Sequence, residues 1–361
     1  MSSLYEQIKD KYDISVKVLT RQGEAKVTYR GCLIYPEWWM ELYYSSYSNA
    51  AGLKKFAIGI CKFFAKVIKF FGGNYEKSIS RRFFHGAGDY DWVISFGEGV
   101  ATTFTQYCPN SNKVTWIHFD YGQFPRNISQ ETLYGKFKYI VCVAKTGQRH
   151  FVERYPSLKD KTKYIYNFLD YDRVRRLSTE AIPDSISAED FNIISVGRIA
   201  QVKRFSMIPE IAAGIKAAGI KFQWRILGPA TDPEEVANLE ENIKKYDVSD
   251  CVSWLDNKTN PYPYIKQSDL YVCLSSSEAC PMVFNEARVL DVPIVSTNFE
   301  SAFEFINSGE DGIICTIDQM AKALTDLIAN RQLYDRIKQH SQESLIDNKK
   351  ILLEIDNMLE V

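Results

Sequence analysis

The stretch that decides the fold is LYVCLSSSEACPMVFNEA, residues Leu270–Ala287. Its opening apolar run, Leu270–Leu274, is bounded by polar residues, which predicts a buried strand. A short turn follows, and Pro281 then opens a run with the pattern of a helix. Proline is favoured at the first helical position because its missing N–H would have no partner there. The stretch therefore predicts a helix that begins at the carboxyl end of a buried strand.

Two carboxylates flank this predicted helix start. Glu278 lies in the loop, and Glu286 lies about one and a half turns into the helix. The N–H groups of Met282 and Val283 point toward the same space, where open α/β sheets hold anions and other ligands. The arrangement indicates a polyhydroxylated anion, such as a sugar attached to a phosphate. The alternative is that Glu278 caps the helix and Glu286 lies on a solvated face, since a Glu-x7-Glu spacing alone is a weak signal.

The rest of the second half repeats the strand–helix alternation. Six such units predict a doubly wound, Rossmann-like sheet, and a similar alternation in the first half predicts a second parallel sheet. We expect two α/β domains facing a cleft, 1–168 and 169–345, with the C-terminal helix 346–361 packing back on the first. The expected strands are 14–19, 26–32, 92–96, 114–118, 139–144, 163–167, 192–196, 222–227, 252–255, 270–274, 293–297 and 312–316.

Composition and charge exclude several classes of protein. Lys+Arg 44 against Asp+Glu 45 gives a formal charge of −1, so there is no overall basic field for binding nucleic acid. The 8 cysteines form no Cys-x-x-Cys and the 4 histidines are dispersed, so the sequence shows no ligand cluster for a metal ion. Scattered cysteines indicate a reducing compartment, and neither a signal peptide nor an apolar run of ~18 residues is visible. We therefore expect a cytoplasmic protein.

Two cations follow the first strand of the second domain. Gly197 permits a tight turn there, and Arg198 and Lys203 leave the carboxyl end of the strand, where they could bind a pyrophosphate and stabilise its developing charge. Gly228 ends the next strand at an equivalent place and allows close backbone approach to a ligand. The alternatives are two solvated surface cations and a simple turn.

These motifs occur in a fixed order that resembles a known family. They are Val196-Gly197-Arg198 with Lys203, Ile226–Gly228, Glu278 with Glu286-Ala287, Val292–Thr297, and Glu304 followed by Asp311-Gly312. Together they resemble the C-terminal domain of a GT-B retaining glycosyltransferase of glycosyltransferase family 4 (glycosyl transferases group 1). The first half resembles the acceptor domain of that family more loosely, through 91–98, 116–120 and 164–167.

The resemblance implies a role for each site residue. Arg198 and Lys203 would hold the donor diphosphate, Glu286 would accept from the nucleotide ribose, and His118 would lie across the cleft near the reacting sugar. Glu278 would contact the sugar hydroxyls, helped by the backbone amides that follow it. The implied catalytic residues are Glu278, His118, Arg198 and Lys203, and the implied donor-binding residues are Gly197, Arg198, Lys203, Gly228, Glu278, Cys280, Met282, Val283 and Glu286. The implied reaction is a metal-independent hexosyl transfer with retention of configuration, so the resemblance implies no metal site and no cofactor.

The sequence departs from the family pattern in several places. Ala279-Cys280-Pro281 replaces a Gly-Phe pair, while Arg204, Asp256 and Asp291 stand where glycine is common. Met1 enters near the end of the first helix of the family pattern. We therefore expect the first domain to lack its opening strand and Gly-rich loop, either because the chain begins late or because part of the active-site floor is missing.

The segment 53–71 has a one-sided pattern. Leu53, Phe56, Ala57, Ile60, Phe64, Val67, Ile68 and Phe71 fall on one helical stripe, with Lys54, Lys55, Lys62, Lys66 and Lys69 on the other side and no acidic residue. Such a helix can lie in a lipid interface and be attracted by anionic headgroups. The alternative is a surface helix that packs its apolar stripe on its own domain.

The sequence favours a retaining glycosyltransferase that moves a sugar from a nucleotide-diphosphate donor to a glycan or lipid-linked glycan. The expected setting is synthesis of capsule or exopolysaccharide, with peripheral contact at the inner face of the cell membrane. Two alternatives stay open. One is a catalytically impaired or truncated nucleotide-sugar-binding protein, and the other is a nucleotide-sugar epimerase of the same architecture.

Overall fold

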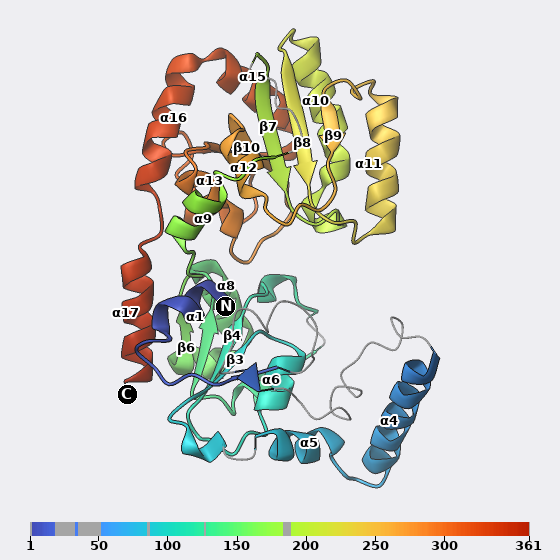
Figure 1. The fold of residues 1–361 in the computed structure, drawn as a ribbon, viewed down its shortest axis with the longest axis vertical. Helices are drawn as coiled ribbons and strands as arrows, with labels where there is room; N and C mark the ends of the chain where they lie inside the picture. The colour runs from blue at the N-terminus through green and yellow to red at the C-terminus, as the bar shows by residue number, and fades with distance from the viewer. Residues whose placement is uncertain are drawn as a thin grey trace.

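The computed structural model describes residues 2–18, 33–34, 52–84, 87–125, 128–182 and 189–360. They form two lobes, drawn one above the other in Figure 1, each built around a parallel sheet. The predicted strand 26–32 lies outside the described residues. Of the predicted strand 14–19, the structure assigns β1 (Val16–Lys17), which pairs in parallel with β2 (Leu33–Ile34).

The first lobe holds a four-stranded sheet in the order β3-β4-β5-β6. Its strands are β3 (Val93–Phe96), β4 (Lys113–Ile117), β5 (Tyr139–Cys142) and β6 (Thr162–Tyr164). The helices of this lobe are α1 (Ser2–Ile8), α4 (Gly52–Phe70), α5 (Tyr75–Phe83), α6 (Val100–Thr105), α7 (Glu131–Tyr134) and α8 (Lys145–Arg154). Within the described residues β3 forms one edge of this sheet, so the expectation that an opening strand is lacking stays a prediction.

The second lobe holds a six-stranded sheet in the order β12-β11-β10-β7-β8-β9. Its strands are β7 (Phe191–Val196), β8 (Phe222–Leu227), β9 (Val252–Trp254), β10 (Leu270–Cys273), β11 (Ile294–Thr297) and β12 (Ile313–Cys315). The helices are α9 (Tyr171–Leu177), α10 (Ile208–Ala217), α11 (Pro233–Lys245), α12 (Tyr262–Lys266), α13 (Met282–Val289), α14 (Ala302–Phe305), α15 (Met320–Ala329) and α16 (Arg331–Glu343). The strand order reverses between β7 and β10, so this is the doubly wound arrangement that the alternation predicts.

Two apolar cores cover the two faces of this sheet. One contains Ile193, Trp224 and Val272 with Ile211 and Leu324 of α10 and α15. The other contains residues of α9, α12, α13 and α14 packed on the opposite face, among them Val174, Ile265, Phe284 and Phe305. Because the sheet is buried on both faces, its strands read as continuous apolar runs in the sequence.

The C-terminal segment of the chain passes from the second lobe to the first. Figure 1 shows α16 beside the upper lobe and α17 (Asn348–Leu359) running down beside the lower one. Ile351 and Ile355 of α17 pack in one cluster with Val114, Trp116 and Val141 of the first sheet. The end of the chain is therefore part of the core of the first lobe.

Candidate functional site

The loops after β7, β8 and β10 are joined by backbone hydrogen bonds at the reversal of strand order. Gly197 N donates to Leu227 O at 2.8 Å, and Ile199 N donates to Pro229 O at 2.9 Å. Ser276 N donates to Val202 O, also at 2.8 Å. The segments that carry the predicted site residues are thus held together by main chain, at the place where open α/β sheets bind ligands.

Gly228 is the tightest point of this junction. Its φ is +145°, and a Cβ at this position would lie 1.8 Å from the carbonyl oxygen of Gly197. Only glycine fits such a contact, because any side chain would collide with backbone. The close approach predicted for Gly228 is therefore made to the neighbouring loop of the chain itself.

Lys203 and Glu278 meet in the middle of the site. Lys203 Nζ donates to Glu278 Oε1 at 2.5 Å, and Ser275 Oγ donates to the same oxygen at 2.6 Å. The two charged side chains are 19% and 18% exposed. Lys203 passes over Gly197, where an added Cβ would lie 3.2 Å from its Cε. The alternative in which Lys203 is a solvated surface cation is wrong.

The helix that follows Glu278 begins one residue later than the sequence predicts. It runs from Met282, and Pro281 is its N-cap residue and not its first residue. The carboxylate of Glu278 bonds to Lys203 and Ser275, and its carbonyl accepts from Ser301 Oγ at 2.6 Å. The reading of Glu278 as a helix cap is therefore wrong.

Glu286 projects from α13 into a half-buried position. Burial raises the pKa of its carboxyl from 4.5 to about 7, and the Tyr262 hydroxyl lies 3.4 Å from Oε1. A carboxyl in this environment does not lie on a solvated face. It retains acceptor capacity for a ligand hydroxyl.

Arg198 differs from the other predicted cations. Its side chain is exposed, and it forms no hydrogen bond or ion pair with the part of the chain that the structure describes. The next residue, Ile199, is fully buried and fixes the backbone beneath it. The guanidinium is therefore free to bind an anion at the mouth of the site.

His118 reaches the site from the first lobe. It lines a cavity of about 210 Å³ together with Trp116, Asn167 and Met282, the first residue of α13. Burial lowers the pKa of its imidazole, which keeps the ring neutral near pH 7. The two lobes therefore bring His118 and the start of α13 to one cavity, although no hydrogen bond joins His118 to Glu278 in the described residues.

The residues that replace the Gly-Phe pair pack across the boundary between the lobes. Ala279 and Cys280 lie against the apolar cluster that α17 forms with the first sheet. Burial raises the pKa of the Cys280 thiol to about 12, so it is not a thiolate nucleophile near neutral pH. Val283, the next predicted donor-binding residue, is half-buried and is the second residue of α13.

Three other departures fall on left-handed backbone. Arg204, Asp256 and Asp291 have φ values of 55°, 56° and 62°. These are positions where glycine is unstrained and where aspartate is tolerated better than most residues. The chain therefore keeps the backbone conformation that glycine would favour while using other residues.

Sequence reasoning missed a contact that joins the two lobes. Glu304 Oε1 accepts from Lys145 N at 2.7 Å and from the Tyr166 hydroxyl at 2.8 Å. Its Oε2 accepts from Thr146 N and Thr146 Oγ1, each at 2.8 Å. Ala144, the N-cap residue of α8, cannot cap that helix, so a carboxylate of the second lobe does so. An alanine at a helix start was the one signal in the sequence that a cap must come from elsewhere.

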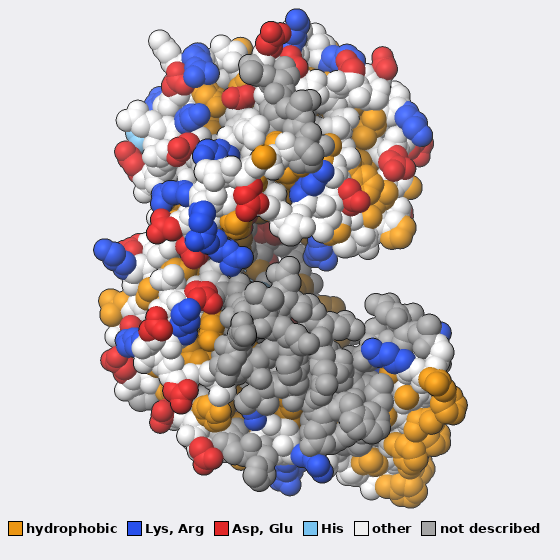
Figure 2. Space-filling model, in the orientation of Figure 1, with side chains coloured by type: hydrophobic (Ala, Val, Ile, Leu, Met, Phe, Trp, Pro, Cys, Tyr) orange, Lys and Arg blue, Asp and Glu red, His pale blue; other side chains and the backbone are white. Residues whose placement is uncertain are grey.

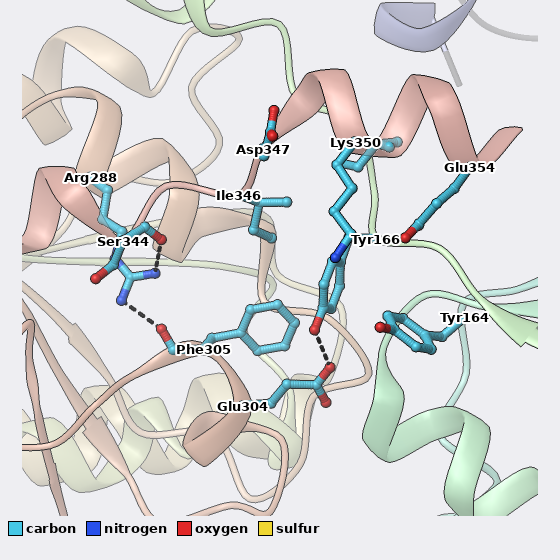
Figure 3. Close-up of a pocket in the computed structure, with 11 residues that line it drawn as sticks. Tyr164, Tyr166, Arg288, Glu304, Phe305, Ser344, Ile346, Asp347, Lys350 and Glu354 are labelled. Atoms are coloured by element: carbon cyan, nitrogen blue, oxygen red, sulfur yellow. Dashed lines mark hydrogen bonds between the residues drawn. The ribbon is translucent and has the colours of Figure 1, made fainter. Parts of the chain in front are cut away.

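Figure 3 shows the cavity beside this contact, of about 230 Å³. It lies between the two chain segments that connect the lobes. Tyr164 and Tyr166 line it beside one connection, and Ile346 and Asp347 line it on the other. Arg288 of α13 is buried and donates to the carbonyls of Phe305 and Ser344 at 2.6 and 3.1 Å. The helix that carries Glu286 is thereby tied to α14 and to the segment that leads into α17.

The residues that the structure describes contain no group of three or more side chains that could hold a metal ion. None of their helices has the length and apolar character to cross a bilayer.

Comparison with known proteins identifies the second lobe. Residues 179–344 match the model of the family glycosyl transferases group 1. The second lobe therefore matches a group 1 glycosyl transferase domain. The narrower assignment to glycosyltransferase family 4 stays a prediction.

Curated relatives match about half of the chain. An uncharacterized glycosyltransferase of Methanocaldococcus jannaschii, MJ1059, is 26% identical over 211 residues, which are 52% of this chain and 48% of the relative. The lipopolysaccharide core biosynthesis glycosyltransferase LpsE of Rhizobium meliloti is 26% identical over 191 residues, 52% of this chain and 54% of LpsE. The matched segments thus span about half the length of these relatives.

Solved structures match over both lobes. Alr3699/HepE of Anabaena in complex with UDP has a TM-score of 0.69 at 16% identity and covers 96% of this chain and 100% of its own. A glycosyltransferase of Rickettsia africae has a TM-score of 0.70 at 16% identity, covering 99% and 92%. The expected GT-B arrangement, two Rossmann-like domains around a cleft, is confirmed.

Proposed function

We propose that this protein is a retaining glycosyltransferase that moves a hexose from a nucleotide-diphosphate donor to a glycan or lipid-linked glycan. The observation that carries the proposal is the contact of Lys203 with Glu278 at the reversal of strand order. Beside it lies Arg198, which has no partner among the residues that the structure describes. Lys203 and Glu278 lie 2.5 Å apart, so the cation can bind the phosphate of a sugar phosphate while the carboxylate binds the sugar hydroxyls.

In this proposal the donor replaces the contact between the two side chains. The diphosphate binds Lys203 and Arg198. Glu278 is then free to accept hydrogen bonds from the hydroxyls of the donor sugar. Glu286 accepts from the ribose hydroxyls in its half-buried position. The relatives support this assignment, since HepE was solved with UDP and with UDP-glucose.

The transfer step follows from the charges. The bond between the anomeric carbon and the diphosphate oxygen breaks, and its electron pair leaves with the diphosphate. Arg198 and Lys203 stabilise that departing charge, as a metal ion does in other transferases, so the proposed reaction is independent of metal. The acceptor hydroxyl attacks the face that the diphosphate leaves and gives its proton to the departing phosphate, so the configuration is retained.

His118 would act from the first domain. A neutral imidazole can donate or accept one hydrogen bond, and the cavity that it shares with Met282 places it beside the start of α13. In this role it orients the reacting sugar against the acceptor. The proposed setting is the synthesis of surface polysaccharide at the cytoplasmic face of a membrane. The curated relatives support it, since they include lipopolysaccharide core, amylovoran and O-antigen biosynthesis glycosyltransferases.

The test is donor turnover. Purified protein is incubated with a panel of UDP- and GDP-sugars, with and without membrane extract, and release of nucleotide diphosphate is followed. Glu278→Ala and Arg198→Ala run beside Glu241→Ala, which removes an exposed carboxylate of α11 away from the site. Release from one donor that is lost in the first two variants and kept in the third supports the proposal. The same release in excess chelator supports metal independence, and NMR of the product reports the anomeric configuration. Donor binding without release, or isomerised donor without acceptor, would overturn it.

A further inference from the structure

The apolar stripe of α4 faces away from its own domain. Leu53 is 88% exposed, Phe56 is 68% exposed and Phe71, just beyond the helix, is 80% exposed. Ile60, Phe64 and Ile68, between them on the same stripe, are exposed as well. The alternative in which α4 packs this stripe on its own domain is wrong.

The opposite side of α4 holds the helix to the protein. Ile58 is fully buried and shares a helical face with Lys62 and Lys69, four and eleven residues further on. The helix packs on α5, and Figure 1 shows it standing out to one side of the lower lobe. In Figure 2 hydrophobic side chains gather over this helix at the lower right. The helix therefore contacts its domain through the face of Ile58 and exposes the apolar stripe on the opposite face.

The charge of this surface is of one sign. Between Gly52 and Asn74 there are five lysines and no acidic residue. Lys54 and Lys66 are exposed, and each can reach past the edge of the stripe because its stem is long. The helix has 19 residues and is about 28 Å long, with apolar side chains exposed from end to end.

We propose that α4 is a docking helix for an anionic lipid bilayer and lies flat among the headgroups. The phenylalanines, Leu53 and the isoleucines of the stripe enter the boundary with the acyl chains, while the lysines stay at the level of the lipid phosphates. Five lysines within one helix prevent it from crossing the bilayer, in agreement with the absence of spanning helices among the described residues.

Charge decides between a bilayer and a protein partner. A protein groove that takes a phenylalanine stripe supplies a defined shape and pairs flanking charges one by one. The flanks of α4 carry only positive charge and no acidic group that would set an orientation, which fits a fluid surface of uniform negative charge. The inference goes beyond the proposed function and does not depend on it, since binding to lipid requires no sugar donor.

The experiment is co-sedimentation of the full chain with lipid vesicles. One set is phosphatidylcholine alone, and the other is phosphatidylcholine mixed with phosphatidylglycerol. We expect binding to the anionic set, weaker binding to the neutral set, and release from the anionic set as salt is added. Lys54→Gln with Lys66→Gln should lower binding to anionic vesicles by about 30-fold, since each lysine near such a surface contributes roughly a fivefold factor. Phe56→Ser with Phe64→Ser should lower it by about 100-fold or more.

Matched variants control for exposure and for charge. Phe303→Ser removes a phenylalanine that is 61% exposed on the second domain, and Lys322→Gln with Lys349→Gln removes two exposed lysines elsewhere. Both should bind vesicles like the unmodified chain, and all variants should melt at its temperature. Binding to neither vesicle set, equal loss in the control variants, or self-association that the phenylalanine variant abolishes in the absence of vesicle binding would each overturn the proposal. The lysine variant and the salt series keep the test decisive if the phenylalanine variant fails to fold.

Discussion

The loop that carries Glu278 and the helix α4 place polar and apolar groups in opposite ways. In the loop, charged side chains are turned inward and already bonded, with Lys203, Ser275 and Glu278 in contact at the junction of three strands. In α4, apolar side chains are turned outward and have no such partners. A surface that binds a small anion needs fixed donors and acceptors, whereas a surface that binds a fluid bilayer needs only apolar area and charge of one sign.

The largest effect should come from removing the charge at the centre of the loop. Glu278→Ala leaves Lys203 without its partner and removes the acceptor for sugar hydroxyls, so we expect the rate of nucleotide diphosphate release to fall by about a thousand-fold or more. Thermal unfolding of the same variant checks that the fold is kept. A rate near that of the unmodified chain would show that the contact with Lys203 is structural only.

The backbone junction beneath that charge can be broken directly. Gly228→Ala places a Cβ against the carbonyl of Gly197, so we expect a loss of roughly 3 kcal/mol or more in the free energy of unfolding. Urea unfolding followed by tryptophan fluorescence measures it. Gly219→Ala is the control, since Gly219 has a similarly positive φ of 76° but no atom within 4 Å of an added Cβ. Equal losses in the two variants would mean that backbone strain, and not the close approach, makes Gly228 necessary.

The contact between the lobes gives an intermediate effect. Glu304→Ala removes four hydrogen bonds and the cap of α8, and we expect a loss of about 2–3 kcal/mol in the free energy of unfolding. Glu300→Ala is the matched control, because Glu300 contacts Arg149 and His150 of the same helix from an exposed position and should contribute under about 1 kcal/mol. A larger loss for Glu300→Ala than for Glu304→Ala would contradict this ranking.

A dependence on pH should follow from Glu286. Its folded carboxyl has a pKa of about 7 against 4.5 when unfolded, so the folded chain holds a proton that the unfolded chain has lost. Stability is therefore lost as pH rises from about 4.5 to 7, and Glu286→Gln, which carries no charge, should avoid that loss. We expect the variant to exceed the unmodified chain by roughly 3 kcal/mol in the free energy of unfolding above pH ~7 and to match it below pH ~4.5. Urea unfolding at a series of pH values measures the difference, and a constant gap would exclude this titration as its cause.

The smallest effect belongs to α4. Phe56→Ser removes a side chain that is mostly exposed, so the free energy of unfolding should change by no more than about 0.5 kcal/mol. Ile58→Ser, two residues on, removes a fully buried side chain and should cost about 2 kcal/mol or more. Denaturation of the two variants side by side tests which face of α4 holds the helix to its domain.

The pattern of the strands was predictable because each side chain of a buried parallel strand meets an apolar neighbour. The runs at Leu270–Leu274 and 192–196 predicted β10 and β7 to within a residue or two for this reason. The start of α13 was placed one residue early, since a proline is tolerated both as an N-cap residue and as the first residue of a helix. The motif order predicted which loops meet, because the carboxyl ends of parallel strands share one edge of a sheet.

The side-chain contacts of the site were harder to predict from the sequence. The sequence placed Lys203 and Glu278 in neighbouring loops but could not show that they touch, because a distance between side chains 75 residues apart depends on how three strands are aligned. It found Glu304 as part of a motif without its role, because the helix that it caps lies in the other domain. The orientation of α4 was also undecided, since the same periodic stripe fits a helix facing inward or outward.

The sequence by itself determined the alternation of strands and helices, the two parallel sheets and the residues that gather at the reversal of strand order, because these follow from local periodicity and chain connectivity. The tertiary structure alone decided which charges are paired, that Glu286 is desolvated, and which side of α4 meets water. These depend on contacts between segments far apart in the chain, and a periodic pattern carries no information about the partner on its other side.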